Sequence, residues 1–180
     1  GDLEIKATGS SSLMRKEGVN DYEEFAKDIL NVISDKPVSF EVFADDFEQM
    51  EIQARLIASW GKNVYVKIPV TNCKRESSSD LIEKLTKEGI KLNITAIFTL
   101  EQVKEVANSL KNGSSAFVSV FAGRIADTGI DPLPRMQDAL KLLKPISNAE
   151  LLWASPREVL NIYQAESIGC DIITATSDLI

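Results

Sequence analysis

Residues 63–98, NVYVKIPVTNCKRESSSDLIEKLTKEGIKLNITAIF, contain the clearest structural pattern of the chain. NVYVKIPV (63–70) and KLNITAIF (91–98) are almost continuous apolar runs, as expected of strands that are covered on both faces. Between them, SSSDLIEKLTKEG (77–89) has helical spacing, a serine or aspartate cap and a glycine stop. A helix between two such strands predicts that the strands run parallel, because a parallel pair needs a crossover connection.

The same strand–helix unit recurs along the chain. Further strands are expected at KPVSFEVFA (36–44), SAFVSVFA (115–122), AELLWAS (149–155) and CDIITAT (170–176). Further helices are expected at DYEEFAKDILNVIS (21–34), DDFEQMEIQARLIASW (45–60), TLEQVKEVANSLKNG (99–113), PRMQDALKLLKPI (134–146) and PREVLNIYQAESIG (156–169).

This alternation predicts an α/β fold, a (β/α)8 TIM barrel formed by a single domain over residues 1–180. An ordinary barrel has about 250 residues, so this one is expected to be compact or partly incomplete at the termini. A doubly wound sheet is the alternative. No GxGxxG or GxxxxGK[ST] follows any strand, which weighs against the nucleotide-binding forms of that fold.

The composition excludes several classes of function. The net charge of −7 and the pI of about 4.8 argue against nucleic acid or an anionic membrane as partner. The 180 residues include no histidine, which removes Ser-His-Asp and Cys-His nucleophiles and histidine zinc sites. Cys73 and Cys170 form no disulfide framework, and no apolar run suits a signal peptide or a membrane span. We therefore expect a reduced, cytoplasmic protein.

Polar residues cluster toward the carboxyl ends of five consecutive predicted strands. They are Glu41, Lys67, Asn93, Thr95, Ser119, Arg124, Ser155 and Arg157. In a parallel barrel these strand ends converge on one mouth, where active sites are found. The sequence thus predicts one convergent site.

Lys67 is the residue that most needs an explanation, because it interrupts the apolar strand 63–70. Desolvation disfavours the charged form of a lysine, and the neutral amine can attack a carbonyl to form a Schiff base. A lysine whose stem packs while its ammonium reaches water is the simpler alternative. Glu41 could move protons or could serve only as a salt-bridge partner of Lys67. Arg124 and Arg157, with serine hydroxyls and the helix start at 156, could clamp a phosphate or form surface ion pairs.

The sequence resembles the transaldolase family of class I aldolases over nearly its whole length. The matching pieces, in order, are SLMRKEGV (12–19), SFEV (39–42), VKIPVT (66–71), EGIKLNITAIFTLEQ (88–102), SVFAGRIADTG (119–129) and WASPREV (153–159). The resemblance implies a (β/α)8 barrel that transfers a dihydroxyacetone unit from a ketose phosphate to an aldose phosphate. The resemblance implies that no metal and no organic cofactor is needed. It also implies sugar-phosphate substrates as partners and a homo-oligomer.

The resemblance also implies a role for each matching residue. Lys67 would form the Schiff base, and Glu41 would act as acid and base through a water held with Thr95. Asn93 and Ser119 would hold the dihydroxyacetone unit. The substrate phosphate would bind to Arg124, Ser155 and Arg157.

Two positions bear on the type of reaction that the resemblance implies. Related aldolases that cleave fructose 6-phosphate outright carry glutamine at the position of Glu41 and tyrosine at that of Phe121, so this chain resembles the transferases. A fructose-6-phosphate aldolase of the same imine chemistry is the alternative among enzymes. Two departures from the family pattern favour a further alternative, an impaired barrel that only binds sugar phosphates. Ser10 in TGSSSL (8–13) stands where the family has asparagine. The first strand of the family, which carries an aspartate, is not recognisable in this sequence, and Asp2 is not assigned to that position.

Overall fold

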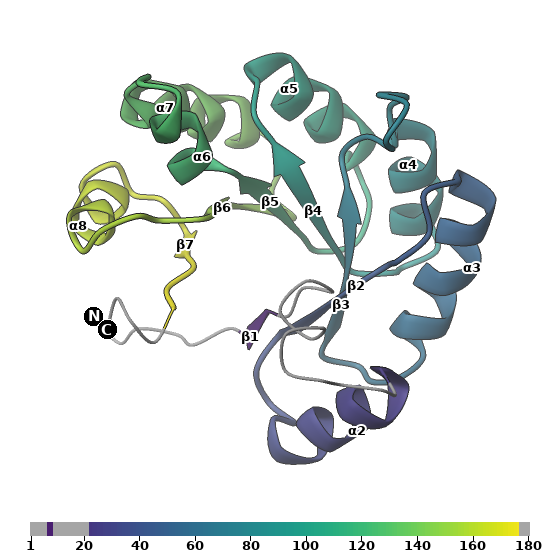
Figure 1. Cartoon of the computed structure of the whole chain (residues 1–180). Helices are drawn as coiled ribbons and strands as arrows, with labels where there is room; N and C mark the ends of the chain where they lie inside the picture. The colour runs from purple at the N-terminus through teal and green to yellow at the C-terminus, as the bar shows by residue number, and fades with distance from the viewer. Residues whose placement is uncertain (1–6, 9–21, 177–180) are drawn as a thin grey trace.

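A computed structural model describes residues 7–8 and 22–176 of the chain, which form one curled parallel sheet with helices outside it (Figure 1). Seven strands follow one another in chain order, and each pairs in parallel with the next. They are β1 (Ala7–Thr8), β2 (Val38–Glu41), β3 (Val64–Pro69), β4 (Leu92–Ile97), β5 (Ala116–Val120), β6 (Ala149–Trp153) and β7 (Ile172–Ile173). The order and curl confirm the predicted barrel class. Within the described residues no ladder joins β7 back to β1.

Helices follow the strands and lie on the convex side of the sheet (Figure 1). They are α2 (Tyr22–Val32), α3 (Phe47–Ala58), α4 (Ser79–Lys87), α5 (Leu100–Ser109), α6 (Ala122–Asp127), α7 (Pro132–Leu143) and α8 (Leu160–Ser167). Asp46 caps α3 through its side chain, and Thr99 and Gln102 form a capping box on α5. None of the helices in the described ranges is long and apolar enough to cross a membrane.

Side chains alternate between the two faces of the sheet along each strand, and each face carries its own apolar cluster. On β3, Val64, Val66 and Ile68 are buried against the helices in the larger cluster. Tyr65, on the opposite face, belongs to a smaller cluster inside the curl with Phe117 and other inner-face residues. Because side chains alternate, Lys67 points to the inner face as Tyr65 does. The larger core therefore lies between the sheet and the helices, and the concave face carries polar groups beside the smaller cluster.

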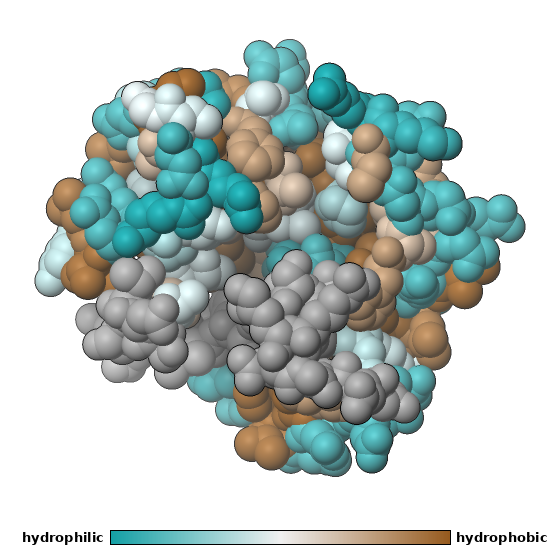
Figure 2. All heavy atoms as spheres, in the orientation of Figure 1, coloured by the Kyte–Doolittle hydropathy of each residue, from teal (hydrophilic) through white to brown (hydrophobic). Residues whose placement is uncertain are grey.

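Some apolar residues remain at the outer rim of the molecule. Figure 2 shows hydrophobic residues over α3 and α8, where Ile52, Leu56 and Leu160 are each at least half exposed. These two patches are available for contact with another protein surface.

The structure differs from the sequence-based expectation at several boundaries. The last strand shrinks to Ile172–Ile173, whereas Ala7–Thr8 forms a strand in a segment that is too polar to predict one. α6 lies mostly between the predicted strand 115–122 and the predicted helix 134–146, where no helix was expected, and α8 begins at Leu160, not at residue 156. Asp2, Ser10 and the SLMRKEGV match lie outside the described residues.

Candidate active site

The strand register brings the predicted polar residues together on the concave face. Glu41 on β2 pairs with Lys67 on β3, and Lys67 pairs with Asn93 on β4. Thr95 lies two residues beyond Asn93 and Ser119 lies on the neighbouring β5, both buried. These five residues alternate with outward-facing core residues, so they share the inner surface of adjacent strands. The carboxyl ends of the strands open at the same mouth.

Lys67 and Glu41 form the charged centre of this surface. Their Nζ and Oε2 atoms are 3.7 Å apart, and the two side chains are only 14% and 20% exposed. This separation allows Coulomb attraction but exceeds the range of a direct N–H···O hydrogen bond. Glu41 therefore does form an ion pair with Lys67, as one of the two interpretations of the sequence expected. The pair nevertheless leaves the lysine nitrogen without a direct bond to this carboxylate.

A hydrogen-bonded chain crosses the concave face beside Lys67. The Asn93 Nδ2 donates to Ser39 Oγ at 3.0 Å, and Ser119 Oγ donates to Asn93 Oδ1 at 2.7 Å. All three residues are buried. This chain fixes which end of the Asn93 amide faces which strand, and it leaves one N–H of Nδ2 for another acceptor. Asn93 is thus held in a defined orientation next to the lysine.

Thr95 has an unused hydroxyl at this site. Its Oγ1 is buried and has no hydrogen-bond partner among the described residues, and the same holds for the indole Nε1 atoms of Trp60 and Trp153. Of these three atoms, only Thr95 Oγ1 lies on the concave face. Ala96, directly after it, has φ +60°, and the β4–β5 register shifts between Ile94 and Ile97. Because an unpaired buried hydroxyl is costly, a water or a substrate group is the expected partner.

Aromatic rings lie on the concave face both below and above the polar residues around Lys67, toward the amino ends and the carboxyl ends of the strands. Tyr65 and Phe117 stack with centroids 4.1 Å apart and planes 7° apart. Tyr65 precedes Lys67 by two residues on the same face, so the stack lies toward the amino ends of the strands. Phe121, at the carboxyl end of β5, packs against this cluster and meets Phe98 edge-on at 5.5 Å. The predicted site residue Phe121 therefore forms part of the wall.

The two arginines of the predicted phosphate site lie near the mouth. Arg124 on α6 is exposed, with its guanidinium carbon 5.8 Å from the Phe121 ring centroid. Arg157 donates from Nε to Asp127 Oδ1 at 2.8 Å and from Nη2 to Oδ2, which is the surface ion pair considered above. This contact with Arg157 holds the pKa of the Asp127 carboxyl below its usual value. The cluster of Arg124, Arg157 and Asp127 keeps one net positive charge.

The Asp127 carboxylate leaves part of the Arg157 guanidinium available. It takes the edge formed by Nε and Nη2, while Nη1 donates to the Ser155 carbonyl at 3.1 Å. A guanidinium has five N–H groups, and these bonds use three of them. Asp127 and Ser155 thus orient the Arg157 side chain without saturating it.

A very close backbone contact ties Ser155 to α6. A Cβ added at Gly123 would lie 1.5 Å from the Ser155 carbonyl oxygen, so only glycine fits there. Gly123 N also donates to the Ala154 carbonyl at 3.3 Å. Ser155 has φ +58°, a conformation that costs free energy for a serine. This contact places Arg124, on α6, next to the segment that carries Ser155 and Arg157.

The expectation of a helix start at residue 156 as part of the phosphate clamp is wrong. α8 begins at Leu160, and the N–H groups of Arg157 and Glu158 donate to Asn161 Oδ1 at 2.8 and 3.3 Å. The Asn161 side chain therefore satisfies the amides that a phosphate would have used. Side chains are left as the binding groups at this end of the site.

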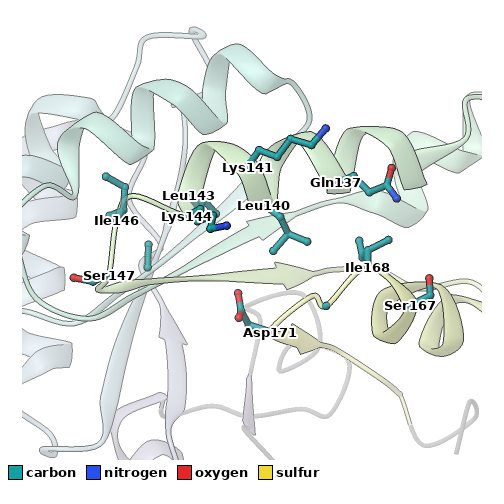
Figure 3. A pocket seen from close by; sticks show the side chains of 12 residues that line it. Gln137, Leu140, Lys141, Leu143, Lys144, Ile146, Ser147, Ser167, Ile168 and Asp171 are labelled. Carbon is teal, nitrogen blue, oxygen red and sulfur yellow. The ribbon is translucent and has the colours of Figure 1, made fainter.

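A separate pocket lies away from these residues. Figure 3 shows a pocket of about 770 Å³ between α7, the start of β6 and the α8–β7 connection, with Leu140, Lys144 and Ile168 in its lining. Asp171 also lines it, but the Asp171 Oδ2 already accepts a 2.7 Å bond from Leu151 N. None of the predicted site residues borders this cavity. We place the site on the concave face, because the convergent polar groups are there.

Sequence reasoning missed several residues that shape the site. Ser39 could have been found, because it precedes Glu41 by two residues and must share its face. Asp127 lies within the quoted SVFAGRIADTG motif. Tyr22 contacts the Glu41 backbone from 19 residues away, and no local pattern reveals this contact. In the described ranges no three His, Cys, Asp or Glu side chains are placed to hold a metal ion.

The family model and the similar sequences all point to the transaldolase family. The family model described as Transaldolase/Fructose-6-phosphate aldolase matches residues 10–180. A probable transaldolase of Dehalococcoides mccartyi is 35% identical over 168 residues, which cover 93% of this chain and 74% of the relative. Probable transaldolase 2 of Listeria monocytogenes is 34% identical, over 96% of this chain and 75% of the relative. A probable transaldolase of Methanococcus maripaludis is 35% identical, with 96% and 76% covered.

Two solved structures share the fold at low sequence identity. KGPDC from Streptococcus mutans has a TM-score of 0.63 at 11% identity, over 96% of this chain and 76% of that one. A mutant of mandelate oxidase with a monooxide FMN adduct has a TM-score of 0.58 at 14% identity, with 86% and 51% covered. At this level of identity, both support the TIM-barrel-like architecture alone.

Proposed function

The chain belongs to the transaldolase/fructose-6-phosphate aldolase family, and on that premise we propose that it transfers a dihydroxyacetone unit between sugar phosphates through a Schiff base on Lys67. The observation that carries the proposal is the Lys67–Glu41 pair, 3.7 Å apart and mostly buried on the concave face. A nucleophilic amine needs a nearby base and a polar lining that holds its substrate. Asn93 and Ser119 supply that lining.

Imine formation is the first step of the proposed reaction. The neutral Lys67 amine attacks the ketone carbon of a ketose phosphate, and the carbonyl oxygen leaves as water after proton transfer. Glu41 accepts the proton of the lysine and returns it to the departing oxygen. A 3.7 Å gap exceeds a direct hydrogen bond, so a water between the two groups would relay the proton. The unpartnered Thr95 hydroxyl is the natural second ligand for that water.

Cleavage of the carbon–carbon bond follows from the protonated imine. The bond between the α and β carbons of the imine breaks as the hydroxyl proton of the departing carbon passes to Glu41, and the electron pair moves into an enamine on Lys67. An aldose phosphate is released. The enamine then attacks a second aldehyde, whose oxygen takes a proton, and water hydrolyses the imine to free the new ketose. Asn93 and Ser119 would hold the hydroxyl groups of the three-carbon unit throughout.

The phosphate end of the substrate would bind at the mouth. Arg124 and the N–H groups of Arg157 not used by Asp127 and Ser155 are the available donors, with the Ser155 hydroxyl beside them. Phe121 would contact the carbon chain between the two ends. This division separates a reacting end near Lys67 from a charged end near solvent.

A lyase that releases free dihydroxyacetone is the second candidate within the same chemistry. In that case water protonates the enamine before an acceptor aldehyde arrives. Glu41 and Phe121 favour the transferase, because the related lyases carry glutamine and tyrosine at these positions. A barrel that only binds sugar phosphates is a third candidate. A homo-oligomer is also proposed, with the exposed apolar residues on α3 and α8 as contact surfaces, to be tested by light scattering of a Leu160→Asp protein.

One experiment separates these candidates. The protein is incubated with fructose 6-phosphate and reduced with borohydride, and the adduct is mapped by mass spectrometry. We expect the adduct on Lys67 and none on a Lys67→Met protein of unchanged circular dichroism. Absence of an adduct from folded wild-type protein leaves only the binding barrel. Where the adduct forms, sedoheptulose 7-phosphate produced on adding erythrose 4-phosphate identifies the transferase, and free dihydroxyacetone identifies the lyase.

A further inference from the structure

The Tyr22 hydroxyl bonds twice to the backbone of the residue that carries the acid–base carboxylate. Glu41 N donates to Tyr22 Oη at 2.8 Å, and Tyr22 Oη donates to the Glu41 carbonyl at 3.2 Å. Tyr22 begins α2, so this contact joins a helix terminus to the carboxyl end of β2. One hydroxyl thus satisfies both backbone polar groups of a single residue.

This contact lies on the edge of β2 that faces away from Lys67. On the other edge, Val42 N donates to the Lys67 carbonyl at 3.1 Å. The N–H and C=O of one strand residue point to the same side, so those of Glu41 point toward β1. The described part of β1 ends at Thr8, opposite Ser39, two residues short of Glu41. The Tyr22 hydroxyl therefore provides at Glu41 the bonds that a neighbouring strand would provide.

The ring of Tyr22 is fixed by its surroundings. It meets Phe40, Phe43 and Trp60 edge-on, with centroid distances of 6.1, 4.6 and 5.7 Å. Burial raises the pKa of Tyr22 to about 12, so the phenol stays protonated and can donate and accept at once. A hydroxyl held in this way fixes the backbone of Glu41 and with it the origin of the Glu41 side chain.

We propose that Tyr22 is a positioning residue for Glu41, one that keeps the carboxylate at the distance from Lys67 that a relayed proton transfer needs. This inference rests on the proposed function of Lys67 and Glu41. Without the hydroxyl, the Glu41 backbone would exchange its two bonds for water, and the carboxylate would lose its fixed origin. Proton transfer would slow, whereas binding at Arg124 and Arg157, on the opposite side of the mouth, would be unchanged.

The test compares Tyr22→Phe with Tyr163→Phe, which removes the same hydroxyl from a tyrosine that is 64% exposed on α8. We expect Tyr22→Phe to lower kcat about tenfold with KM within about twofold, because a small displacement of a catalytic group costs mainly rate. Tyr163→Phe should match wild type. Unfolding midpoints of both proteins establish that they are folded at the assay temperature.

A double-mutant cycle separates positioning from general destabilisation. In a Glu41→Gln background, the rate of borohydride-trapped adduct formation should not fall further when Tyr22→Phe is added, because the group that Tyr22 positions has lost its proton chemistry. A destabilising effect alone would lower the rate by the same factor in both backgrounds. Should Tyr22→Phe fail to fold, difluorotyrosine placed at position 22 keeps the shape and ionises at lower pH. The kcat of this protein should then fall reversibly with rising pH as that phenol ionises. The kcat of wild type should show no such fall over the same pH range.

The possible failures are distinguishable. No Lys67 adduct on wild-type protein overturns the proposed function and this inference with it. An adduct on wild type, together with a Tyr22→Phe kcat equal to that of wild type, overturns the Tyr22 assignment alone. So does an equal loss in both backgrounds of the cycle, or a difluorotyrosine protein without the pH limb.

Discussion

Replacing Gly123 by alanine should disrupt phosphate recognition more than the chemistry at Lys67. The added Cβ would lie 1.5 Å from the Ser155 carbonyl oxygen and 2.7 Å from its carbonyl carbon, and both are backbone atoms. Cβ contacts essentially never fall below 3.0 Å, so the two segments must separate by 3.0 − 1.5 = 1.5 Å. That movement shifts Arg124 relative to Ser155 and Arg157. Overpacking of this kind costs roughly 1–3 kcal/mol of stability.

The expected functional loss follows from the displacement. A shift of about 1 Å in a positioned group can cost on the order of 100-fold in rate. We therefore expect kcat/KM for erythrose 4-phosphate as acceptor to fall about 100-fold, and kcat/KM for unphosphorylated erythrose to fall far less. The measured quantity is the ratio of the two values, which is insensitive to the fraction of protein that is folded.

Gly89→Ala is the matched control for this substitution. Gly89 has φ +86° with nothing within 4 Å of an added Cβ, so alanine strains the backbone there without a clash. It follows α4 and precedes β4, at the end of the sheet opposite the mouth. Gly89→Ala should lower stability and keep the acceptor ratio. A folded Gly123→Ala protein with the wild-type ratio would refute the placement of the phosphate subsite.

Three further predictions concern single contacts. Ser39→Ala leaves the Asn93 amide without its acceptor; stability should fall by about 1 kcal/mol and kcat about fivefold, and unchanged kinetics would show that the Asn93 orientation is immaterial. Asp127→Asn removes the charge that orients Arg157. The KM for phosphorylated substrates should rise severalfold, and the KM for unphosphorylated ones should not. An equal rise in both KM values would contradict the role given to Arg157. Burial raises the pKa of Tyr22 from 10.0 to about 12, so its stabilisation is complete below pH 10 and is lost as the pH rises toward 12. Urea unfolding at about pH 9 and about pH 11 should show wild type losing stability relative to Tyr22→Phe, and a constant difference would contradict the burial of this phenol.

The fold was predictable because strand and helix periods alternate strongly along the chain. Val64, Val66 and Ile68 face the helices as the apolar pattern requires, and the same period places Lys67 on the inner face. Asn93, Thr95 and Ser119 follow from this rule. It failed at the chain ends, where pairing partners rather than local pattern decide whether Ala7–Thr8 or Ile172–Ile173 is extended.

Other parts of the site depend on contacts between distant segments. The Gly123–Ser155 approach and the Tyr22–Glu41 bonds join residues 32 and 19 positions apart. The local sequence around Gly123 or Tyr22 gives no sign of either contact. The helix start at 156 was misplaced because a proline there suggested the first turn. The Asn161 side chain instead binds the amides of Arg157 and Glu158 ahead of α8.

The stacked rings of Tyr65 and Phe117 lie on the concave face below Lys67 and close the gap between each other. With the ring centroids 4.1 Å apart, no carbon chain can pass between them toward the amino ends of the strands. Under the proposed function, a linear sugar that enters from the mouth beside these rings would stop near the level of Lys67. Only a carbonyl within a carbon or two of the inserted end can then meet the amine. Under the proposed function, the depth of insertion would favour 2-ketoses over sugars whose ketone lies further along the carbon chain. No group that recognises the carbonyl position itself would be needed.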